Sequence, residues 1–424
     1  MVPLGAVRRN DRSFETVAVV VANGLPLAGV AAFGWELDAL VSLYWFELGV
    51  LSFWALVRAL FAGRPSEFDE NPLIAGALAG KRTSVPIPFT DLGIRLSTLP
   101  VLGVAAPLLA LVWFFAGVMT VGVLGETPDP DALVMVTVAV FGIFVSEGAS
   151  TLVEYFHRGG YREHSAQTAI QGVFTRGAVI GLGGMFTAMI VGLTAGSVSP
   201  DESIGAVDTG AVGLPILIGV VLVKFGFDLA GLYRERLVAF DEASYFEFGW
   251  AYEPPSDEPI EPIGAVDDRV RPTVAGRSLG GISPRNVRRH PSALVVGGFV
   301  LLVALLFAMG RVWDVVFALV VVGLLVAMGL LAIDYWLRYG GTEYRIAEDG
   351  NAIVAYDRLF RTRLWRIEPW DESGLRLERD LIDAWLDTST VVVERPGEAS
   401  DRRLPRLRDP DPLLSVFDRR VTRS

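Results

Sequence analysis

Four ionisable residues, Glu47, Glu147, Lys224 and Asp228, lie inside long apolar stretches of this chain. A charged group inside a membrane costs free energy, so such groups pair with one another or line a path for ions or protons. Lys224 and Asp228 are one helical turn apart and can pair within one helix. Two interpretations stay open. The residues form a structural ion network, or they form a relay in which Lys224 keeps a carboxylate poised between protonation states.

A second group, Glu154, His157 and His164, has the residue types of a metal site. Glu-x-x-His places a carboxylate and an imidazole on one face of a helix, which suits a transition metal. The motif occurs once and the chain has 3 His, too few for a two-metal centre. We interpret these residues as polar groups at a helix end, with a metal site as the alternative.

Other catalytic signatures are absent from the sequence. The chain has no Cys, which excludes disulfides, thiolate metal sites and cysteine nucleophiles. It also has no Walker A loop, Gly-x-Ser-x-Gly elbow or His-Glu-x-x-His motif. We therefore expect that the protein is not an enzyme and uses no cofactor.

Eight apolar stretches must position these charges, and each is long enough for a helix that crosses a membrane, which needs about 20 residues. Hydrophobic residues make up 52% of the chain. The stretches are Thr16–Gly34, Leu40–Phe61, Ser97–Val123, Leu133–Phe156, Val173–Ala195, Ala211–Tyr233, Ser292–Gly310 and Val312–Leu337.

Basic residues fall in alternate gaps between these stretches. They lie before the first stretch and in the second, fourth and sixth gaps, and Arg176 is counted in the fourth. The first, third and fifth gaps carry acids alone, and Arg311 in the seventh gap is the exception. Because positively charged loops stay in the cytoplasm, we expect a multi-pass protein of the cell membrane with both termini cytoplasmic.

The charge balance is acidic, with a formal net charge of −11. Lys occurs only at Lys81 and Lys224, and Arg supplies the other cations. This composition is similar to that of proteins from salt-loving archaea, whose charged surfaces keep them soluble. An acidic protein is also a poor partner for nucleic acid, which we exclude.

The chain divides into four parts by composition. We expect a six-helix transmembrane domain over residues 1–237 and a polar cytosolic linker, rich in Pro and acids, over 238–287. A two-helix transmembrane hairpin follows over 288–339 and a small cytosolic domain over 340–424.

The last part has the sequence pattern of strands. Thr342–Ile346 and Ala352–Tyr356 alternate in polarity and flank Asp349-Gly350, which predicts a β-hairpin. Further short strands are expected at Thr362–Ile367, Leu375–Leu377 and Thr390–Glu394, and an amphipathic helix after Pro412. The pattern predicts a small α+β module.

Four motifs between Arg288 and Val421 resemble those of the bacterial pleckstrin-homology-like membrane proteins. They are His290-Pro291, Tyr344-Arg345-Ile346, Thr388-Ser389-Thr390-Val391-Val392-Val393 and Leu407-Arg408-Asp409-Pro410. The chain departs from that family at Ala347, where Thr is usual, and in a polar loop at Asp380–Asp387. The resemblance implies a pleckstrin-homology-like fold and a binding or scaffolding module, and it names no ligand.

The first six spans are similar to an uncharacterised family of archaeal and bacterial membrane proteins. The resemblance rests on Leu43-Tyr44-Trp45-Phe46-Glu47 and on Lys224 with Asp228. It implies no mechanism.

Together these observations predict an all-α bundle of eight membrane helices with a pleckstrin-homology-like cytosolic domain. We expect a scaffold or assembly factor that lies in the lipid bilayer and binds protein or lipid headgroups through its tail. The alternative is a proton- or ion-coupled transporter or channel that uses Glu47, Glu147, Lys224 and Asp228.

Overall fold

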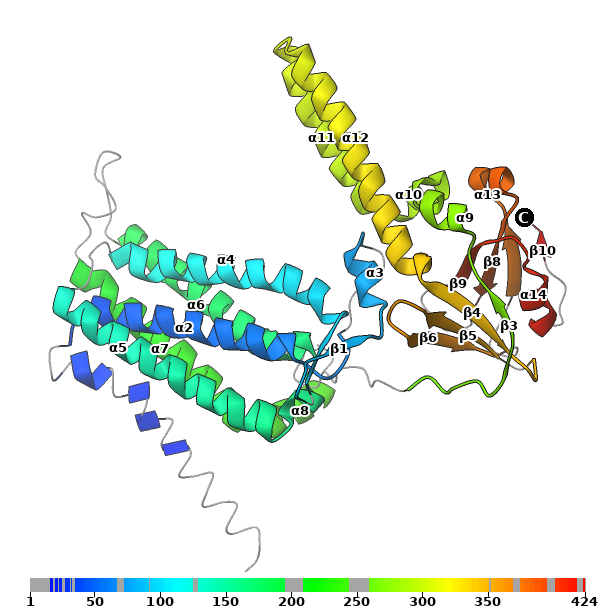
Figure 1. Ribbon diagram of the computed structural model, residues 1–424. Helices are drawn as coiled ribbons and strands as arrows, with labels where there is room; N and C mark the ends of the chain where they lie inside the picture. Colours follow the sequence, from blue (N-terminus) through cyan, green and yellow to red (C-terminus); the bar gives the residue numbers. More distant parts are fainter. Residues whose placement is uncertain are drawn as a thin grey trace, which may run out of the picture. The chain divides into compact units, whose positions relative to one another are not determined.

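The chain forms two compact units in the computed structural model (Figure 1). The first comprises residues 1–64 and 101–255, and the second comprises residues 65–100 and 256–424. The chain therefore passes from one unit to the other three times. The structure describes residues 16–17, 20–21, 23–24, 27–30, 32, 35–66, 72–90, 92–124, 129–194, 209–243, 259–350, 352–368, 374–394, 401–417 and 422–423.

The first unit is a bundle of helices, of which the long ones are apolar. They are α2 (Leu37–Leu60), α4 (Thr98–Leu124, whose first turn belongs to the second unit), α5 (Pro130–Ser150), the π-helical η1 (Thr151–His157), the 3₁₀ turn η2 (Gly160–Glu163), α6 (Ala166–Thr194), α7 (Thr209–Leu232) and α8 (Arg234–Ala243). Helix α2 is the most buried of the long helices and packs against α5, α6 and α7. Its Val41 and Leu48 share a core with Ile216 and Leu217 of α7.

Helices α2 and α4 meet through a tryptophan pair. The rings of Trp45 and Trp113 stack with their centroids 4.6 Å apart. Each indole N–H donates to the backbone carbonyl of the other residue, at 2.9 and 3.0 Å. An indole donor without a partner is costly in apolar surroundings, and this reciprocal arrangement satisfies both.

Glycines let α6 approach α4 closely. A Cβ atom at Gly181 would lie 2.7 Å from the ring of Phe115, and one at Gly184 would lie 2.7 Å from the carbonyl oxygen of Met119. The neighbouring Gly183 has nothing within 4 Å of its Cβ position. Small residues at such contacts are what helix packing in membranes requires.

The second unit combines two four-stranded sheets and the small two-stranded sheet β1-β2 with a helical hairpin. Its elements are α3 (Ala75–Ala79), β1 (Ser84–Pro86), β2 (Gly93–Arg95), β3 (Val266–Val270), α9 (Val274–Leu279), η4 (Gly280–Ile282), α10 (Pro284–Arg289), α11 (Pro291–Met309), α12 (Trp313–Tyr335), η5 (Trp336–Gly340), β4 (Thr342–Ala347), β5 (Ile353–Asp357), β6 (Thr362–Ile367), β7 (Gly374–Glu378), α13 (Leu381–Leu386), β8 (Ser389–Glu394), β9 (Arg402–Leu407), α14 (Asp411–Phe417) and β10 (Thr422–Arg423).

The larger sheets have the strand orders β3-β4-β5-β6 and β10-β7-β8-β9. Apolar residues of both sheets, such as Ile353 and Val391, form one core that Leu413 and Phe417 of α14 complete. Strand β3 pairs antiparallel with β4 although the α11–α12 hairpin separates them in sequence. The hairpin is thus an insertion between two neighbouring strands of one sheet.

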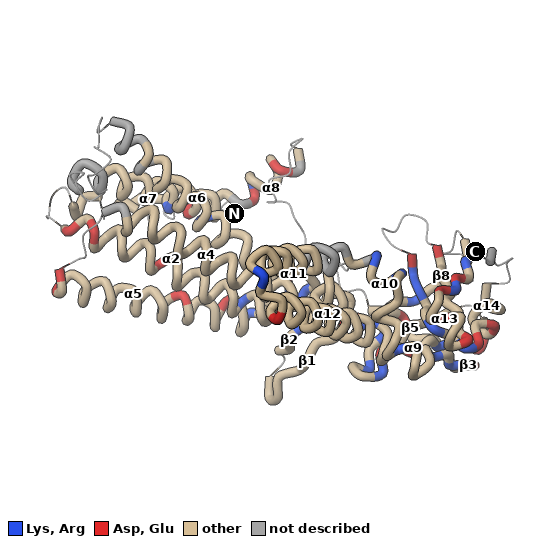
Figure 2. Tube along the Cα trace, turned by 90° about the horizontal axis from the view of Figure 1, so that it is seen from above, with Lys and Arg blue, Asp and Glu red and all other residues tan. Residues whose placement is uncertain are grey.

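Six helices are long and apolar enough to cross a membrane among the residues that the structure describes. They are Leu37–Leu60, Thr98–Gly122, Pro130–His157, Ala166–Phe186, Pro215–Leu232 and Trp313–Gly340. Figure 2 shows these helices almost free of charged residues along most of their length. The chain therefore has the character of a membrane protein.

Two of the eight expected spans are not among these six. Thr16–Gly34 is described only in short separate pieces, none of which is long enough to be identified as a span. Ser292–Gly310 corresponds to α11 (Pro291–Met309), within which the stretch identified as apolar, Gly297–Met309, is shorter than a full span. Eight spans and two cytoplasmic termini stay predictions.

The second unit contains more structure than the sequence pattern indicated. The strands expected from Thr342 to Glu394 are present, and Gly350 turns the β4–β5 hairpin with φ 65°. Residues of the expected linker 238–287 form β3, α9 and the start of α10. The expected polar loop Asp380–Asp387 contains helix α13, because Asp380 and Asp383 form a capping box that starts it.

Candidate functional site

A three-residue charge centre lies inside the helices of the first unit. The carboxylate of Glu47 on α2 accepts a hydrogen bond from the Lys224 ammonium on α7. Arg176 on α6 donates to the same oxygen of Glu47 at 3.3 Å. All three side chains are largely buried. One carboxylate thus holds two cations from two other helices, which ties α2, α6 and α7 together.

The tyrosine of the Leu43-to-Glu47 motif belongs to this centre. The Lys224 ammonium lies 5.9 Å from the centroid of the Tyr44 ring, within reach of a cation–π attraction. Tyr44 is itself part of the apolar core between α2 and α7. The motif therefore contributes an anion, an aromatic face and, through Trp45, the α4 contact.

The other two predicted residues lie elsewhere in the first unit. Asp228 accepts a hydrogen bond from the Asn23 amide at 2.9 Å. Glu147 on α5 lies 4.0 Å from Arg58 on α2, and both of these side chains are partly exposed. No pair between Lys224 and Asp228 occurs among the described contacts. The structure thus brings Glu47 and Lys224 together and leaves Glu147 and Asp228 apart from them.

The packing of the helices explains this pairing, because α2 lies directly against α7. Helix α2 starts at Leu37, three residues before the expected Leu40, so Glu47 stands ten residues into the helix. Lys224 stands fifteen residues into α7, and this difference of about 7 Å in depth is within the reach of its long side chain. Glu147 stands seventeen residues after Pro130, near the end of its helix.

Arg176 was missed because it was counted as a cation of the fourth gap. Helix α6 starts at Ala166 and includes Arg176. The position of Arg176 within the apolar stretch that begins at Val173 could have indicated this. Asn23, the partner of Asp228, lies in the first apolar stretch and was missed because it is uncharged.

The alternative metal residues are not gathered into a site. Glu154 and His157 lie in the π-helical η1, where the wider i→i+5 turn rotates residues three apart away from a common face. The ring of His164 packs against Tyr155, and its Nδ1 lies 2.9 Å from the Gly160 carbonyl oxygen. Among the described residues, no group of three His or acidic side chains is placed to hold a metal.

Two buried carboxylates of the second unit hold the segment that connects α2 to α4. Asp334, at the end of α12, accepts hydrogen bonds from Arg338 at 2.8 Å and from the backbone N–H of Ile74 at 2.7 Å. Asp357 pairs with Lys81, and both side chains are almost fully buried. Residues 72–81 are therefore built into the sheet domain of the second unit.

The His290-Pro291 motif also meets Asp334. The Nε2 atom of His290 lies 3.4 Å from the Asp334 carboxylate. Because Pro291 begins α11 and Asp334 lies in the last turn of α12, this contact fixes the base of the hairpin.

A surplus of arginine surrounds Glu343 at the start of β4. The carboxylate of Glu343 is 1% exposed and accepts from Arg271 at 2.8 Å and Arg345 at 2.9 Å. Arg358 lies 3.8 Å away and is half exposed. Arg277 donates to the carbonyl of Pro272 and has no acidic partner among the described residues. We refer to these four arginines as the arginine face.

The close packing of these charged groups shifts the pKa values of Glu343 and Arg277. Burial opposes ionisation of Glu343, but hydrogen bonds from Arg345 and Arg271 outweigh it and hold the pKa of the carboxyl below its ordinary value. Burial, followed by repulsion from Arg358 and Arg271, lowers the pKa of Arg277. Three guanidinium groups thus share one carboxylate, and the fourth, that of Arg277, lies beside them without an acidic partner among the described residues. Such a surface can bind a further anion, because guanidinium pairs with carboxylates and phosphates in two-point contacts.

Comparison with known proteins identifies a family for the N-terminal part of the chain. The sequence profile described as "Family of unknown function (DUF6498)" matches residues 6–243, more than half of the chain. This range includes the charge centre and the segment 72–81. No curated protein and no solved structure matches the chain. The expected similarity of the first six spans to an uncharacterised family is confirmed; the pleckstrin-homology-like resemblance and the archaeal or bacterial origin stay predictions.

Proposed function

The chain belongs to the DUF6498 family, and we propose that it is a membrane-anchored scaffold that recruits an acidic protein through the arginine face. The observation that carries this proposal is the convergence of Arg271, Arg345 and Arg358 on Glu343, with Arg277 beside them. The local charge is strongly positive on a chain whose net charge is −11. A positive patch of this kind steers and orients an acidic partner.

The charge centre of the membrane helices supports a structural role. Glu47 is engaged by two cations, and the three side chains are contributed by three helices. A buried ion network of this kind fixes which helices meet, and it is consistent with a scaffold. In this proposal the sheet domain has the pleckstrin-homology-like fold, faces the cytoplasm and is not an enzyme.

The proposal is tested with one exposed arginine and a matched control. Arg358→Gln removes a half-exposed cation whose nearest acidic contact is 3.8 Å away, so we expect little effect on stability. Arg408→Gln makes the same charge change on an exposed residue after β9. The full chain and both variants are cross-linked in host membranes and purified, and the captured proteins are quantified by mass spectrometry.

We expect an acidic protein that is captured by the full chain and by Arg408→Gln, and is depleted with Arg358→Gln. The purified partner should then bind with a strong dependence on salt, because the interaction is electrostatic. Equal capture by all three proteins would show that the arginine face is not the recruiting surface.

A transporter is the second candidate, because Glu47, Lys224 and Arg176 lie deep inside apolar helices, where charges often mark an ion path. In that case Lys224→Met would abolish proton or ion flux in proteoliposomes without a loss of thermal stability. A large loss of stability with no measurable flux in the unchanged protein would contradict it.

A further inference from the structure

Helix α13 presents two large apolar side chains to its surroundings. Leu381 is 77% exposed and Trp385 is 75% exposed. They are four residues apart and therefore share one face of the helix. Asp383, between them in sequence, is fully buried on the opposite side. A six-residue helix with its apolar face exposed must be stabilised by contacts on its other face.

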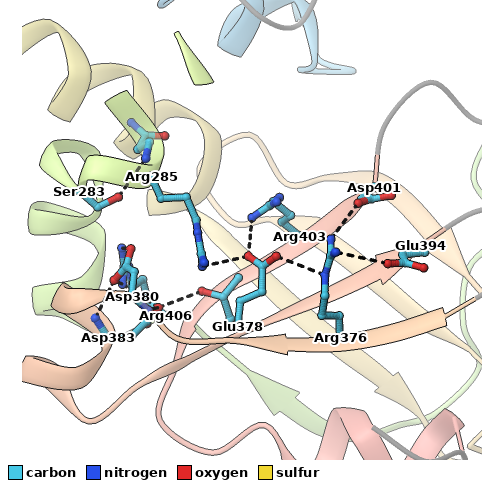
Figure 3. A network of polar contacts seen from close by, with 12 residues as sticks. Ser283, Arg285, Arg376, Glu378, Asp380, Asp383, Glu394, Asp401, Arg403 and Arg406 are labelled. Carbon is cyan, nitrogen blue, oxygen red and sulfur yellow. Dashed lines mark hydrogen bonds and ion pairs between the residues drawn. The ribbon is translucent and has the colours of Figure 1, made fainter. Parts of the chain in front are cut away.

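A buried ionic network holds α13 in this position (Figure 3). Asp380 and Asp383 cap the helix, and Arg406 of β9 donates to both oxygens of Asp380 at 2.5 and 2.7 Å. Arg406 also lies 2.9 Å from Asp383, which accepts from the Thr388 hydroxyl at 2.7 Å. The outward face of α13 is therefore fixed by rigid, buried contacts.

Strain at Arg406 supports the same conclusion. Its backbone has φ 60°, in the left-handed region that an L-residue adopts at a cost, and only a well-determined surrounding holds it there. Its carbonyl accepts the N–H of Thr273, which begins α9. Arg406 thus connects α13, through its side chain, to α9, through its backbone carbonyl.

A hollow of about 430 Å³ lies between α13 and α10 and is lined by three cations and by Asp380, whose carboxylate is already paired with Arg406. Arg285 and Arg288 line it from α10, and Arg379 lines it next to Leu381. Arg285 lies 3.0 Å from Glu378, and Arg379 lies 3.0 Å from the exposed Asp387. Arg288 is exposed and has no polar partner among the described residues.

The location of this hollow follows from the chain. Helix α10 ends at Arg289, and the apolar α11 begins at Pro291 beside the membrane-spanning α12. Figure 1 shows α10 and α13 on the side of the sheets from which α11 and α12 project. Arg288 is therefore within one turn of the hairpin, at the level where a helix leaves the hydrocarbon and meets lipid headgroups.

We infer that α13 and this hollow form an interfacial anchor for anionic lipid. Leu381 and Trp385 enter the headgroup region of the bilayer that α12 crosses, and Arg285, Arg288 and Arg379 bind the lipid phosphate. Trp is enriched at this depth, and cations on the same surface add attraction to anionic lipid. The occupant is the bilayer itself, since α10, which lines the hollow, leads directly into α11 of the apolar hairpin. This anchor is separate from the arginine face and does not depend on the proposed scaffold role.

The absence of Cys makes the test direct, because one introduced cysteine gives a single labelling site. The full chain with Leu381→Cys carries a spin label and is reconstituted in bilayers of phosphatidylcholine with equal phosphatidylglycerol. Collision rates with oxygen and with an aqueous nickel complex measure the depth of the label. Glu348→Cys, exposed at the far end of β4, is the control site.

We expect the Leu381 label to be protected from nickel and accessible to oxygen, and the Glu348 label to be aqueous. Adding Arg288→Gln to Leu381→Cys should lower the ratio of immersed to aqueous label about five-fold, the equivalent of about 1 kcal/mol for one Arg at an anionic surface. Arg408→Gln in the same background should leave the ratio unchanged.

Two results would overturn the inference. A Leu381 label as accessible to nickel as the Glu348 label would place α13 in water and leave its apolar face for another partner. Equal immersion with and without phosphatidylglycerol, unaffected by Arg288→Gln, would show that the hollow does not bind anionic lipid.

Discussion

Replacing Glu47 by Gln removes the carboxylate that holds Lys224 and Arg176 together. The change is close to isosteric, so the packing of Tyr44 and Leu48 around it is preserved. Two cations from α6 and α7 are then left facing each other without their anion. We expect a large loss of stability in the first unit, and a larger one than for Lys224→Met.

The magnitude follows from the geometry. At 3.3 Å and an effective dielectric constant of about 20, the attraction between Glu47 and Arg176 is about 5 kcal/mol before desolvation is counted. Removing one partner of a buried pair typically costs about 3–5 kcal/mol, because a charge is left uncompensated. Lys224→Met leaves Glu47 paired with Arg176, so the loss should be about 1.5–3 kcal/mol, the range for one hydrogen bond to a charged group.

Thermal unfolding in detergent at one scan rate measures these losses. With about 2–4 °C per kcal/mol for a domain of this size, Glu47→Gln should lower the Tm by about 6–20 °C. The double variant should lose about 0.5–3 kcal/mol less than the sum of the single variants, because the two residues interact directly. Glu147→Gln is the matched control, since its contact with the partly exposed Arg58 is 4.0 Å long and should contribute less than about 1 kcal/mol.

Unchanged stability of Glu47→Gln, with additive effects in the double variant, would refute the structural reading of this centre. The charges would then be retained for another purpose, and ion flux would be the quantity to measure next.

Three further predictions concern other parts of the chain. Lys81→Met leaves Asp357 buried without its cation and should destabilise the second unit by about 3–5 kcal/mol, measured as chemical unfolding of that unit; a loss no larger than that of the exposed-site control Arg408→Gln would contradict the pairing. The pKa values of Glu343 and Asp380 lie below their ordinary values of 4.5 and 3.8, so their contribution to stability is complete above those values and is lost as the pH falls through the lower folded-state values; unfolding curves between pH 6 and pH 2 should show this loss and Glu343→Gln should reduce it, whereas an acid transition unchanged by that variant would be inconsistent with the ion pairs. Gly184→Ala should destabilise the first unit by about 1–3 kcal/mol because the new methyl group meets the carbonyl of Met119, whereas Gly183→Ala should not; equal melting temperatures would argue against the close approach of α6 and α4.

The sequence identified the charges of the membrane helices but not their partners. Helical spacing placed Lys224 one turn from Asp228, and this local pairing was the natural expectation. The actual partner of Lys224 is set by which helices lie next to each other and at what depth, and neither is encoded in the spacing within one helix. Arg176 shows the same limit, because a shift of the start of α6 to Ala166 turns a loop cation into a core residue.

In the second unit, strands with alternating polarity were predicted at nearly their observed bounds, as for β6 at Thr362–Ile367. Strand β9 was not expected, because Pro405 and three Arg interrupt its apolar pattern. It lies at the edge of its sheet, where proline is tolerated. Strand β3 was assigned to the linker because its partner β4 lies beyond the inserted hairpin, a long-range pairing that no local pattern reveals.

Both lysines of the chain are engaged in internal ion pairs, Lys224 in the first unit and Lys81 in the second. An amine-acylating reagent therefore reacts faster with either side chain once its own unit opens, since the ammonium must leave its carboxylate and lose a proton to react. The acylation rate of Lys224 then reports how often the first unit opens, and that of Lys81 how often the second unit opens. Mass spectrometry measures both rates in one sample. Rates that rise together in denaturant would mean that the units unfold as one, and rates that separate would rank their stabilities without any engineered probe.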